Sequence, residues 1–314
     1  MKGRFPIRIP RWIKGCSLFI LLIVVLCGFG YAAIYIASST GRQSIVVDGV
    51  ERKYRTHLPS GYDDSQAIPL VLAFHFYGGS ARMMEWLTRF NQIADEEGFI
   101  VVYPEGYKSS WADGSGLFPA DLDYIDDVAF TLALIDELKN QYNLDETRIY
   151  ATGFSNGGFF VQRLACEATE HIAAIATVGA SLATEMLGAC APDGAIPVLM
   201  INGMDDPSVT WEGSPDSVPV PVTASYWSIV NGCDQEPILT TEPDLANDGT
   251  HAHKERYSNC QDDVEVILYA IEGGGHAWPM GNKAVQLWGL FNGRISQQMD
   301  ASRVIWDFFQ NYSG

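Results

Sequence analysis

The serine at the centre of residues 153–157, with the sequence GFSNG, has the surroundings of a nucleophile. A β-rich run over 148–152 precedes it, and apolar residues at helical spacing over 159–166 follow it. The order strand, G-x-S-x-G, helix is typical of a nucleophile elbow, a tight turn that pushes the serine hydroxyl above a sheet edge. The flanking glycines let the strand and the helix approach closely. We therefore predict that Ser155 is a nucleophile and that the backbone N–H of Asn156 points at the oxyanion formed on attack.

The chain supplies an acid and a base for this serine after two later strands. A serine hydroxyl is a weak nucleophile at neutral pH, so it needs a base that is itself oriented by an acid. Asp205 and Asp206 follow the apolar run 196–202, and His276 follows the run 264–271 in a glycine-rich turn. Both positions are carboxyl ends of strands, where sites gather in open α/β sheets. We predict His276 as the base and Asp206 as the acid, because a proline rigidifies the loop after it, with Asp205 as the alternative.

The other histidines after the serine fit the role of base less well. His171 lies at a junction between a helix and a strand, which is typical of a polar surface residue. His251 and His253 lie in a stretch that we interpret as a polar loop. His276 alone follows a predicted strand in a glycine-rich turn, so the prediction rests on this residue.

A loop after an early buried strand should supply a second N–H group for the oxyanion. Residues 75–79, with the sequence HFYGG, occupy that place. The candidate donors are the backbone N–H groups of Tyr77 and Phe76. We interpret His75 as a structural residue that holds this loop rather than as a second base.

The elements that must position these residues alternate between strand and helix patterns. Such alternation indicates a mainly parallel central sheet with helices on both faces, here in one domain over 44–314. Apolar runs of strand length are buried strands, and apolar residues at helical spacing are helices that cover the sheet. The stretch 207–259 looks irregular apart from one helix around 224–230. The expected strands are 44–49, 52–58, 68–76, 98–104, 148–152, 172–178, 196–202 and 264–271, and the other expected helices are 83–94, 126–138, 159–166 and 301–309.

The N-terminal segment reads as an export signal. Residues 1–14 are basic and contain no acid, and the apolar run 15–37 is long enough to span about 30 Å of hydrocarbon as a helix. We therefore expect a basic cytoplasmic flank at 1–14, an uncleaved transmembrane signal-anchor at 15–37 and a polar linker at 38–43. The basic end would stay inside and the rest would be periplasmic or extracellular. Cleavage near residues 37–39, which would release a secreted protein, is the alternative.

Four cysteines lie in the part of the chain that would be exported. An even number of cysteines in an oxidising compartment suggests two disulfides, and four cysteines allow three pairings. Proximity in the sequence favours Cys166–Cys190 and Cys233–Cys260, with free buried thiols as the alternative. No C-x-x-C spacing occurs, so we expect neither a zinc site nor a redox motif.

The overall charge limits the partners of the protein. The formal net charge is −18, which argues against nucleic-acid binding. An acidic surface favours solubility but does not identify a substrate. The sequence leaves the oligomeric state open.

Taken together, these motifs resemble the polyhydroxybutyrate-depolymerase and feruloyl-esterase-like branch of the α/β-hydrolases, which also includes acetyl-xylan esterases. The resemblance covers about residues 44–312 and implies an exported serine esterase with the α/β-hydrolase fold, without a metal or an organic cofactor. It assigns the nucleophile, acid and base to Ser155, Asp206 and His276. The matching segments are 69–73 with the glycines at 78–79, 126–130, 153–158, 164–167, 203–207, 275–279 and 301–309.

One position departs from the family pattern. The family usually has His-Gly at the start of the oxyanion loop, whereas this chain has His75-Phe76. A bulky side chain enters glycine-only backbone regions at a cost. Phe76 therefore either reshapes the loop or fills part of the acyl pocket.

The function expected from these residues is hydrolysis of a carboxylic ester through an acyl-enzyme. The substrate is a polyhydroxyalkanoate-type, feruloyl or acetyl-sugar ester, small or polymeric. Trp111, Trp211 and Trp278 lie on loops that we expect to rim the site and to stack on sugar or phenolic rings, with ordinary loop packing as the alternative. Other functions compatible with the sequence are a serine peptidase, a lactone hydrolase and a catalytically weak, membrane-tethered binding protein. Phe76 is the argument for the last.

Overall fold

The computed structural model describes residues 41–288 and 293–314. The unit Gln43–Gly314 carries nearly all of the central sheet and its helices. The predicted cytoplasmic flank at 1–14, the signal-anchor at 15–37 and residues 38–40 of the linker lie outside the described residues, whereas residues 42 and 43, predicted as linker, belong to strand β1 (Arg42–Val47). Within the described ranges, no helix has both the length and the apolar character needed to cross a bilayer.

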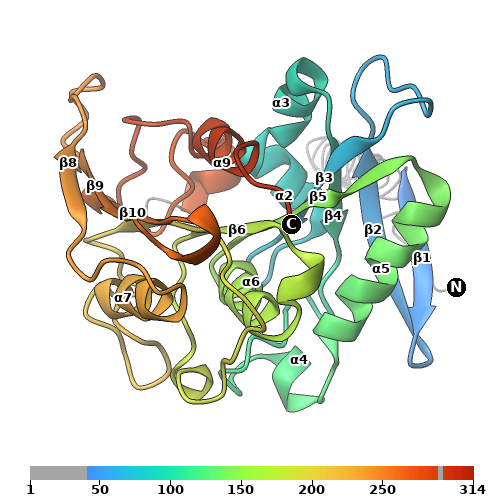
Figure 1. The fold of residues 1–314 in the computed structure, drawn as a ribbon, viewed down its shortest axis with the longest axis horizontal. Helices are drawn as coiled ribbons and strands as arrows, with labels where there is room; N and C mark the ends of the chain where they lie inside the picture. The colour runs from blue at the N-terminus through green and yellow to red at the C-terminus, as the bar shows by residue number, and fades with distance from the viewer. Residues whose placement is uncertain (1–40, 289–292) are drawn as a thin grey trace, which may run out of the picture. The chain divides into compact units, whose positions relative to one another are not determined.

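A mixed sheet runs through the folded unit (Figure 1). Its strand order is β1-β2-β4-β3-β5-β6-β7-β10-β9-β8. The pairings from β4 through β3, β5, β6 and β7 to β10 are all parallel, whereas β2 on β4, β9 on β10 and β8 on β9 are antiparallel. The sheet is therefore mainly parallel, as predicted. The strands are β1 (Arg42–Val47), β2 (Val50–His57), β3 (Ile68–Phe74), β4 (Ile100–Pro104), β5 (Leu144–Phe154), β6 (Ala174–Val178), β7 (Val198–Gly203), β8 (Ile238–Thr241), β9 (His251–Tyr257) and β10 (Val266–Glu272).

Helices cover both faces of the sheet. Side chains alternate between the two faces of β3, so Leu70 and Leu72 lie in one buried cluster and Val71 and Ala73 in the other. The first cluster takes in side chains of α5, α6 and α7, and the second takes in those of α2, α3 and α9. The helices are α2 (Ala81–Thr88), α3 (Phe90–Glu97), α4 (Pro119–Leu122), α5 (Asp127–Gln141), α6 (Asn156–Glu167), α7 (Val220–Val230) and α9 (Ala301–Phe309), with 3₁₀ turns at Thr169–His171, Thr184–Met186, Gln261–Asp263 and Val285–Trp288.

Two helices begin where the sequence places an acidic cap. The side chain of Asp126 accepts from the N–H of Ala129 at the start of α5. Asp300 accepts from the N–H groups of Ser302 and Arg303 at the start of α9. Each carboxylate satisfies donors that have no partner within the helix, and its charge suits the positive end of the helix dipole.

The stretch predicted to be irregular contains two strands, β8 and β9, so that prediction is wrong. β9 has the sequence HAHKERY and pairs with β10, and β8 is exposed along its whole length at the edge of the sheet. β9 is mostly polar and charged, and β8 is only four residues long, so neither has the apolar run that marks a buried strand. His251 and His253 therefore belong to a strand and not to a loop, and the helix of this region, α7, begins four residues before the expected position.

The two predicted disulfides are present. Cys166 at the end of α6 is bonded to Cys190, and Cys233 after α7 is bonded to Cys260 after β9. Each bond fastens a loop to the end of a helix next to the sheet. Two disulfides fit an oxidising compartment.

Candidate active site

Ser155 stands in a strained turn between β5 and α6. Its backbone has φ 54° and ψ −127°, a conformation that non-glycine residues rarely adopt. The serine N–H donates to the carbonyl of Val178 on the neighbouring strand at 3.0 Å. A Cβ atom on Gly153 would lie 2.2 Å from the carbonyl oxygen of Gly157, and one on Gly157 would lie 2.4 Å from that of Phe74. Both glycines of the pentapeptide are therefore needed to form the turn.

Asp206 and His276 meet at the ends of β7 and β10. Asp206 Oδ2 lies 2.7 Å from His276 Nδ1, while Asp206 Oδ1 accepts from the backbone N–H groups of Ser208 and Val209 at 2.7 and 2.8 Å. The Asp206 carboxylate is buried, whereas the side chain of Asp205 is exposed. These contacts favour a proton on Nδ1 of His276 and leave Nε2 free to accept one.

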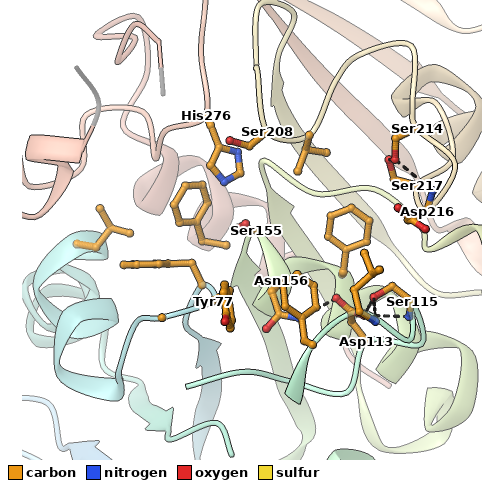
Figure 2. A pocket seen from close by; sticks show the side chains of 18 of the residues that line it. Tyr77, Asp113, Ser115, Ser155, Asn156, Ser208, Ser214, Asp216, Ser217 and His276 are labelled. Carbon is orange, nitrogen blue, oxygen red and sulfur yellow. Dashed lines mark hydrogen bonds between the residues drawn. The ribbon is translucent and has the colours of Figure 1, made fainter. Parts of the chain in front are cut away.

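The imidazole of His276 faces the serine. His276 and Ser155 line one cavity, and Figure 2 shows the ring directed toward Ser155. The ring of Phe154 stacks on the imidazole with centroids 4.9 Å apart, which fixes the plane of the ring. The residues proposed for nucleophile, base and acid therefore come together at one edge of the sheet.

His75 holds the loop after β3, as predicted. Its ring is fully buried, and Nε2 accepts from the N–H of Gly106 at 2.9 Å. Nδ1 lies 2.8 Å from the carbonyl oxygen of Phe76, to which it donates its proton. Burial lowers the pKa of His75 to about 4, so the ring is neutral at physiological pH. A neutral ring with both nitrogens engaged acts as a brace between two loops.

Phe76 fits the oxyanion loop without leaving ordinary backbone conformations. Neither Phe76 nor Tyr77 has a positive φ, and Gly78 takes the left-handed position with φ 74°. The N–H of Gly79 donates to the carbonyl of Phe76 at 2.9 Å and closes the turn. The Phe76 ring packs on Phe154 with centroids 5.7 Å apart and lines the cavity. Phe76 is thus part of the cavity wall, one of the two outcomes expected for the departure from His-Gly.

Asn156 links the start of α6 to the loop after β4. As the first residue of the helix, it has a backbone N–H with no partner one turn earlier, which leaves that group available to an anion. Its buried side chain accepts from the N–H of Trp111 at 2.8 Å and donates to Asp113 Oδ2 at 2.7 Å. Sequence reasoning missed Asp113, because nothing in its glycine- and aspartate-rich loop separates it from solvated acids. Burial, with a smaller contribution from Asp121, raises the pKa of Asp113 to about 7.

The expected role of the tryptophans in rimming the site is wrong for Trp111 and Trp278. Both side chains are fully buried and neither lines the cavity. The indole N–H of Trp111 donates to the carbonyl of His75, and that of Trp278 donates to Ser302 Oγ. Trp211 is half-buried against the core and also lies outside the cavity lining. Large aromatic rings gain most from burial, so a loop position in the sequence did not imply exposure.

The cavity at Ser155 has a volume of about 520 Å³. This volume lies in the range of small-molecule sites. Among the described residues that line it, none is a lysine or an arginine. No group of three or more His, Cys, Asp or Glu side chains in the described ranges is arranged to hold a metal ion. The lining residues are Phe76, Tyr77, Gly78, Met83, Leu87, Asp113, Ser115, Leu117, Phe118, Phe154, Ser155, Asn156, Phe159, Ser208, Val209, Ser214, Asp216, Ser217, His276, Val285 and Gln286.

Comparison with known proteins agrees with this geometry. The chain is 33% identical over 263 residues to the protein named "Putative esterase NocK" of Nocardia uniformis subsp. tsuyamanensis, covering 78% of this chain and 75% of that one. It is 33% identical over 237 residues to feruloyl esterase B of Piromyces equi, covering 72% of this chain and 42% of that longer protein. The crystal structure of an acetyl xylan esterase from Aspergillus awamori has the same fold, with a TM-score of 0.54 at 15% identity, over 80% of this chain and 99% of that one.

The family assignment rests on a match that covers more than half of the chain. Residues 52–219, which contain the oxyanion loop, the strained serine turn and the orienting aspartate, match the model of the family described as Esterase PHB depolymerase. The two relatives are named as a putative esterase and a feruloyl esterase. The protein belongs to the Esterase PHB depolymerase family and is a carboxylic ester hydrolase.

Proposed function

We propose that the protein is a serine esterase that works through Ser155, His276 and Asp206. The observation that carries this proposal is the 2.7 Å contact between His276 Nδ1 and Asp206 Oδ2 beside a serine in a strained turn, at one cavity. A serine, a base and an orienting acid in this arrangement are the parts that nucleophilic acyl transfer requires.

The reaction begins when Nε2 of His276 removes the hydroxyl proton of Ser155 as its oxygen attacks the ester carbonyl. Asp206 keeps the imidazole in the correct tautomer and stabilises the imidazolium. The N–H groups of Asn156 and Tyr77 or Phe76 hold the oxyanion. His276 then protonates the departing alcohol, which leaves an acyl group on Ser155. Water that loses its proton to His276 cleaves this acyl-enzyme and restores the serine.

Among the ester classes expected from the sequence, the cavity best suits a feruloyl-type ester. Its volume exceeds what an acetyl group needs, and the rings of Phe76 and Phe154, which meet edge to face, offer apolar aromatic surface beside the serine. Aromatic rings pack favourably edge-to-face or offset against such a surface. The similarity to feruloyl esterase B of Piromyces equi supports the same choice. Polyhydroxyalkanoate and acetyl-sugar esters are the substrates against which it must be compared.

We also propose that the esterase unit works outside the cytoplasm. The two disulfides and the basic-then-apolar sequence of residues 1–37 support export with a retained anchor. Cell fractionation with protease added to intact cells tests this. Protein in the membrane fraction that external protease digests supports the anchor, and protein confined to the cytosol refutes it.

Hydrolysis of matched nitrophenyl or methyl esters tests the esterase proposal. The series contains acetyl, butyryl and feruloyl esters, and each is given to the wild type and to Ser155→Ala. We expect turnover that the variant loses by at least about a thousandfold, with the feruloyl ester preferred. Activity that survives in Ser155→Ala, or no activity from folded and oxidised wild type, contradicts it.

A further inference from the structure

The cavity lining has an apolar part and a polar part. Phe76, Leu87, Phe154 and Val285 belong to the apolar part and pack in the apolar cluster beneath α2, α3 and α9. The opposite wall comes from the loops after β4 and β7. Its polar side chains are those of Asp113, Ser115, Ser214, Asp216 and Ser217, which we call the polar wall; Leu117 and Phe118 of the loop after β4 line the cavity as well. Figure 2 shows these five side chains to one side of Ser155 and His276.

The polar wall carries negative charge that nothing in the cavity lining balances. Asp113 is 1% exposed, and its carboxylate accepts from the side chains of Asn156 at 2.7 Å and Ser115 at 2.6 Å. Both donors are neutral, so they orient the carboxylate without cancelling its charge. Asp216 is exposed at the mouth, and the described lining holds no lysine or arginine. His276, the remaining group that can carry a positive charge, is paired with Asp206.

We propose that the polar wall is a charge-selective subsite that accepts a neutral or cationic part of the ester and excludes an anionic one. Asp113 and Asp216 determine this selectivity. The inference rests on the proposed ester hydrolysis at Ser155.

The physical basis is the electrostatic energy of a charge brought beside two carboxylates. A carboxylate or phosphate on the substrate would lose its hydration and find no cation among the lining residues. A hydroxyl group can instead exchange hydrogen bonds with the serine hydroxyls and the carboxylates. A cation would be attracted, because the interaction strengthens where the surroundings exclude water.

The test compares esters that differ only in charge. One set keeps the acyl group and varies the alcohol between a neutral, a trimethylammonium and a carboxylate form, and a second set varies the acyl group in the same way. The full chain is assayed for kcat/KM at low ionic strength and pH 8. Because burial raises the pKa of Asp113 to about 7, most of it is ionised at this pH. In at least one set, we expect the anionic ester to react about tenfold or more slowly than the neutral ester.

Variants separate the subsite from the overall charge of the protein. Asp216→Lys should reduce the neutral-to-anionic ratio at least about threefold, and Asp113→Asn should reduce it in the same direction. Each ratio is taken within one variant, so a general loss of activity cancels. The matched control is Glu212→Lys, at an exposed acid of the same loop that lies outside the lining; it changes the net charge by two, as Asp216→Lys does. It should leave the ratio within about 1.5-fold.

Each outcome decides the question. Equal rates for neutral and anionic esters in both sets overturn the inference about the subsite. The proposed function still stands in that case if Ser155→Ala has lost the hydrolysis. If the neutral-to-anionic ratio shifts as much in Glu212→Lys as in Asp216→Lys, or shifts in neither, the discrimination comes from the net charge of −18 and the subsite is overturned as well. No hydrolysis of any ester by folded protein refutes the proposed function itself, and the inference with it.

Discussion

Asp206→Asn should disable the enzyme by forcing the wrong tautomer on His276. In the wild type, Asp206 Oδ1 accepts from two backbone N–H groups and Oδ2 faces His276 Nδ1. An asparagine has one carbonyl oxygen and one NH₂ group. The oxygen must stay with the two N–H donors of the loop, so the NH₂ group faces Nδ1. The imidazole then has to accept at Nδ1 and carry its proton on Nε2, where it cannot receive the proton of Ser155.

The size of the effect follows from the loss of the base. Where an orienting aspartate is replaced in this way, kcat falls about 10⁴-fold, a barrier increase of about 5 kcal/mol. We expect a loss between about 10³-fold and 10⁴-fold here, measured as kcat on a nitrophenyl butyrate ester at pH 7.5. Stability should change little, because the loop keeps both hydrogen bonds, and a urea titration checks this.

Asp205→Asn is the matched control. This neighbour has the same charge but an exposed side chain, so the variant should keep kcat within about twofold of the wild type. If Asp206→Asn retains more than about a tenth of wild-type kcat, the assigned acid is wrong. If Asp205→Asn loses the activity instead, the alternative acid considered from the sequence is the orienting group.

Three further predictions concern the scaffold. Gly157→Ala would put a Cβ atom 2.4 Å from the carbonyl oxygen of Phe74 on β3. The variant should therefore lose its activity and about 3 kcal/mol or more of unfolding free energy, measured with urea. Gly188→Ala is the control, because its Cβ atom meets nothing within 4 Å, and it should stay near wild type in both measurements. Burial lowers the pKa of His75 from 6.5 to about 4 in the folded state. Its contribution to stability is therefore present above about pH 6.5 and is lost as the pH falls toward 4. The unfolding free energy should drop by up to about 3 kcal/mol over that window, and by less in His75→Gln. Replacing Cys233 and Cys260 together by alanine opens a link across a sequence separation of 27 and should cost about 3 to 4 kcal/mol, and an unchanged denaturation midpoint would contradict this.

The proposed nucleophile and base could be picked out from the sequence because each follows a strand in a glycine-containing turn. Ser155 has two glycines that the close strand and helix require, and His276 follows a buried strand in a glycine-rich turn. Strands that are buried on both faces read as apolar runs, so β3, β4, β6 and β7 were visible. Parallel pairing then brings their carboxyl ends to one edge.

Other features could not be predicted from the neighbouring sequence, because they depend on contacts between segments that are distant in the chain. β8 and β9 are strands because they pair at the edge of the sheet, and their own side chains are largely polar or exposed. Asp113 matters because it meets Asn156, 43 positions away in the sequence. Trp111 is buried because Phe74 and Phe160 surround it. The residues that flank each of these features in the sequence show no pattern that predicts it.

Covalent labelling of Ser155 tests the central claim most directly. The wild type and Ser155→Ala are treated with an alkyl fluorophosphonate, and the adduct is located by intact-protein and peptide mass spectrometry. We expect one adduct per chain on Ser155, with activity lost in step with labelling, and no adduct in Ser155→Ala. Labelling at another residue, or full ester hydrolysis by protein that does not react, would contradict the assignment of Ser155 as the nucleophile.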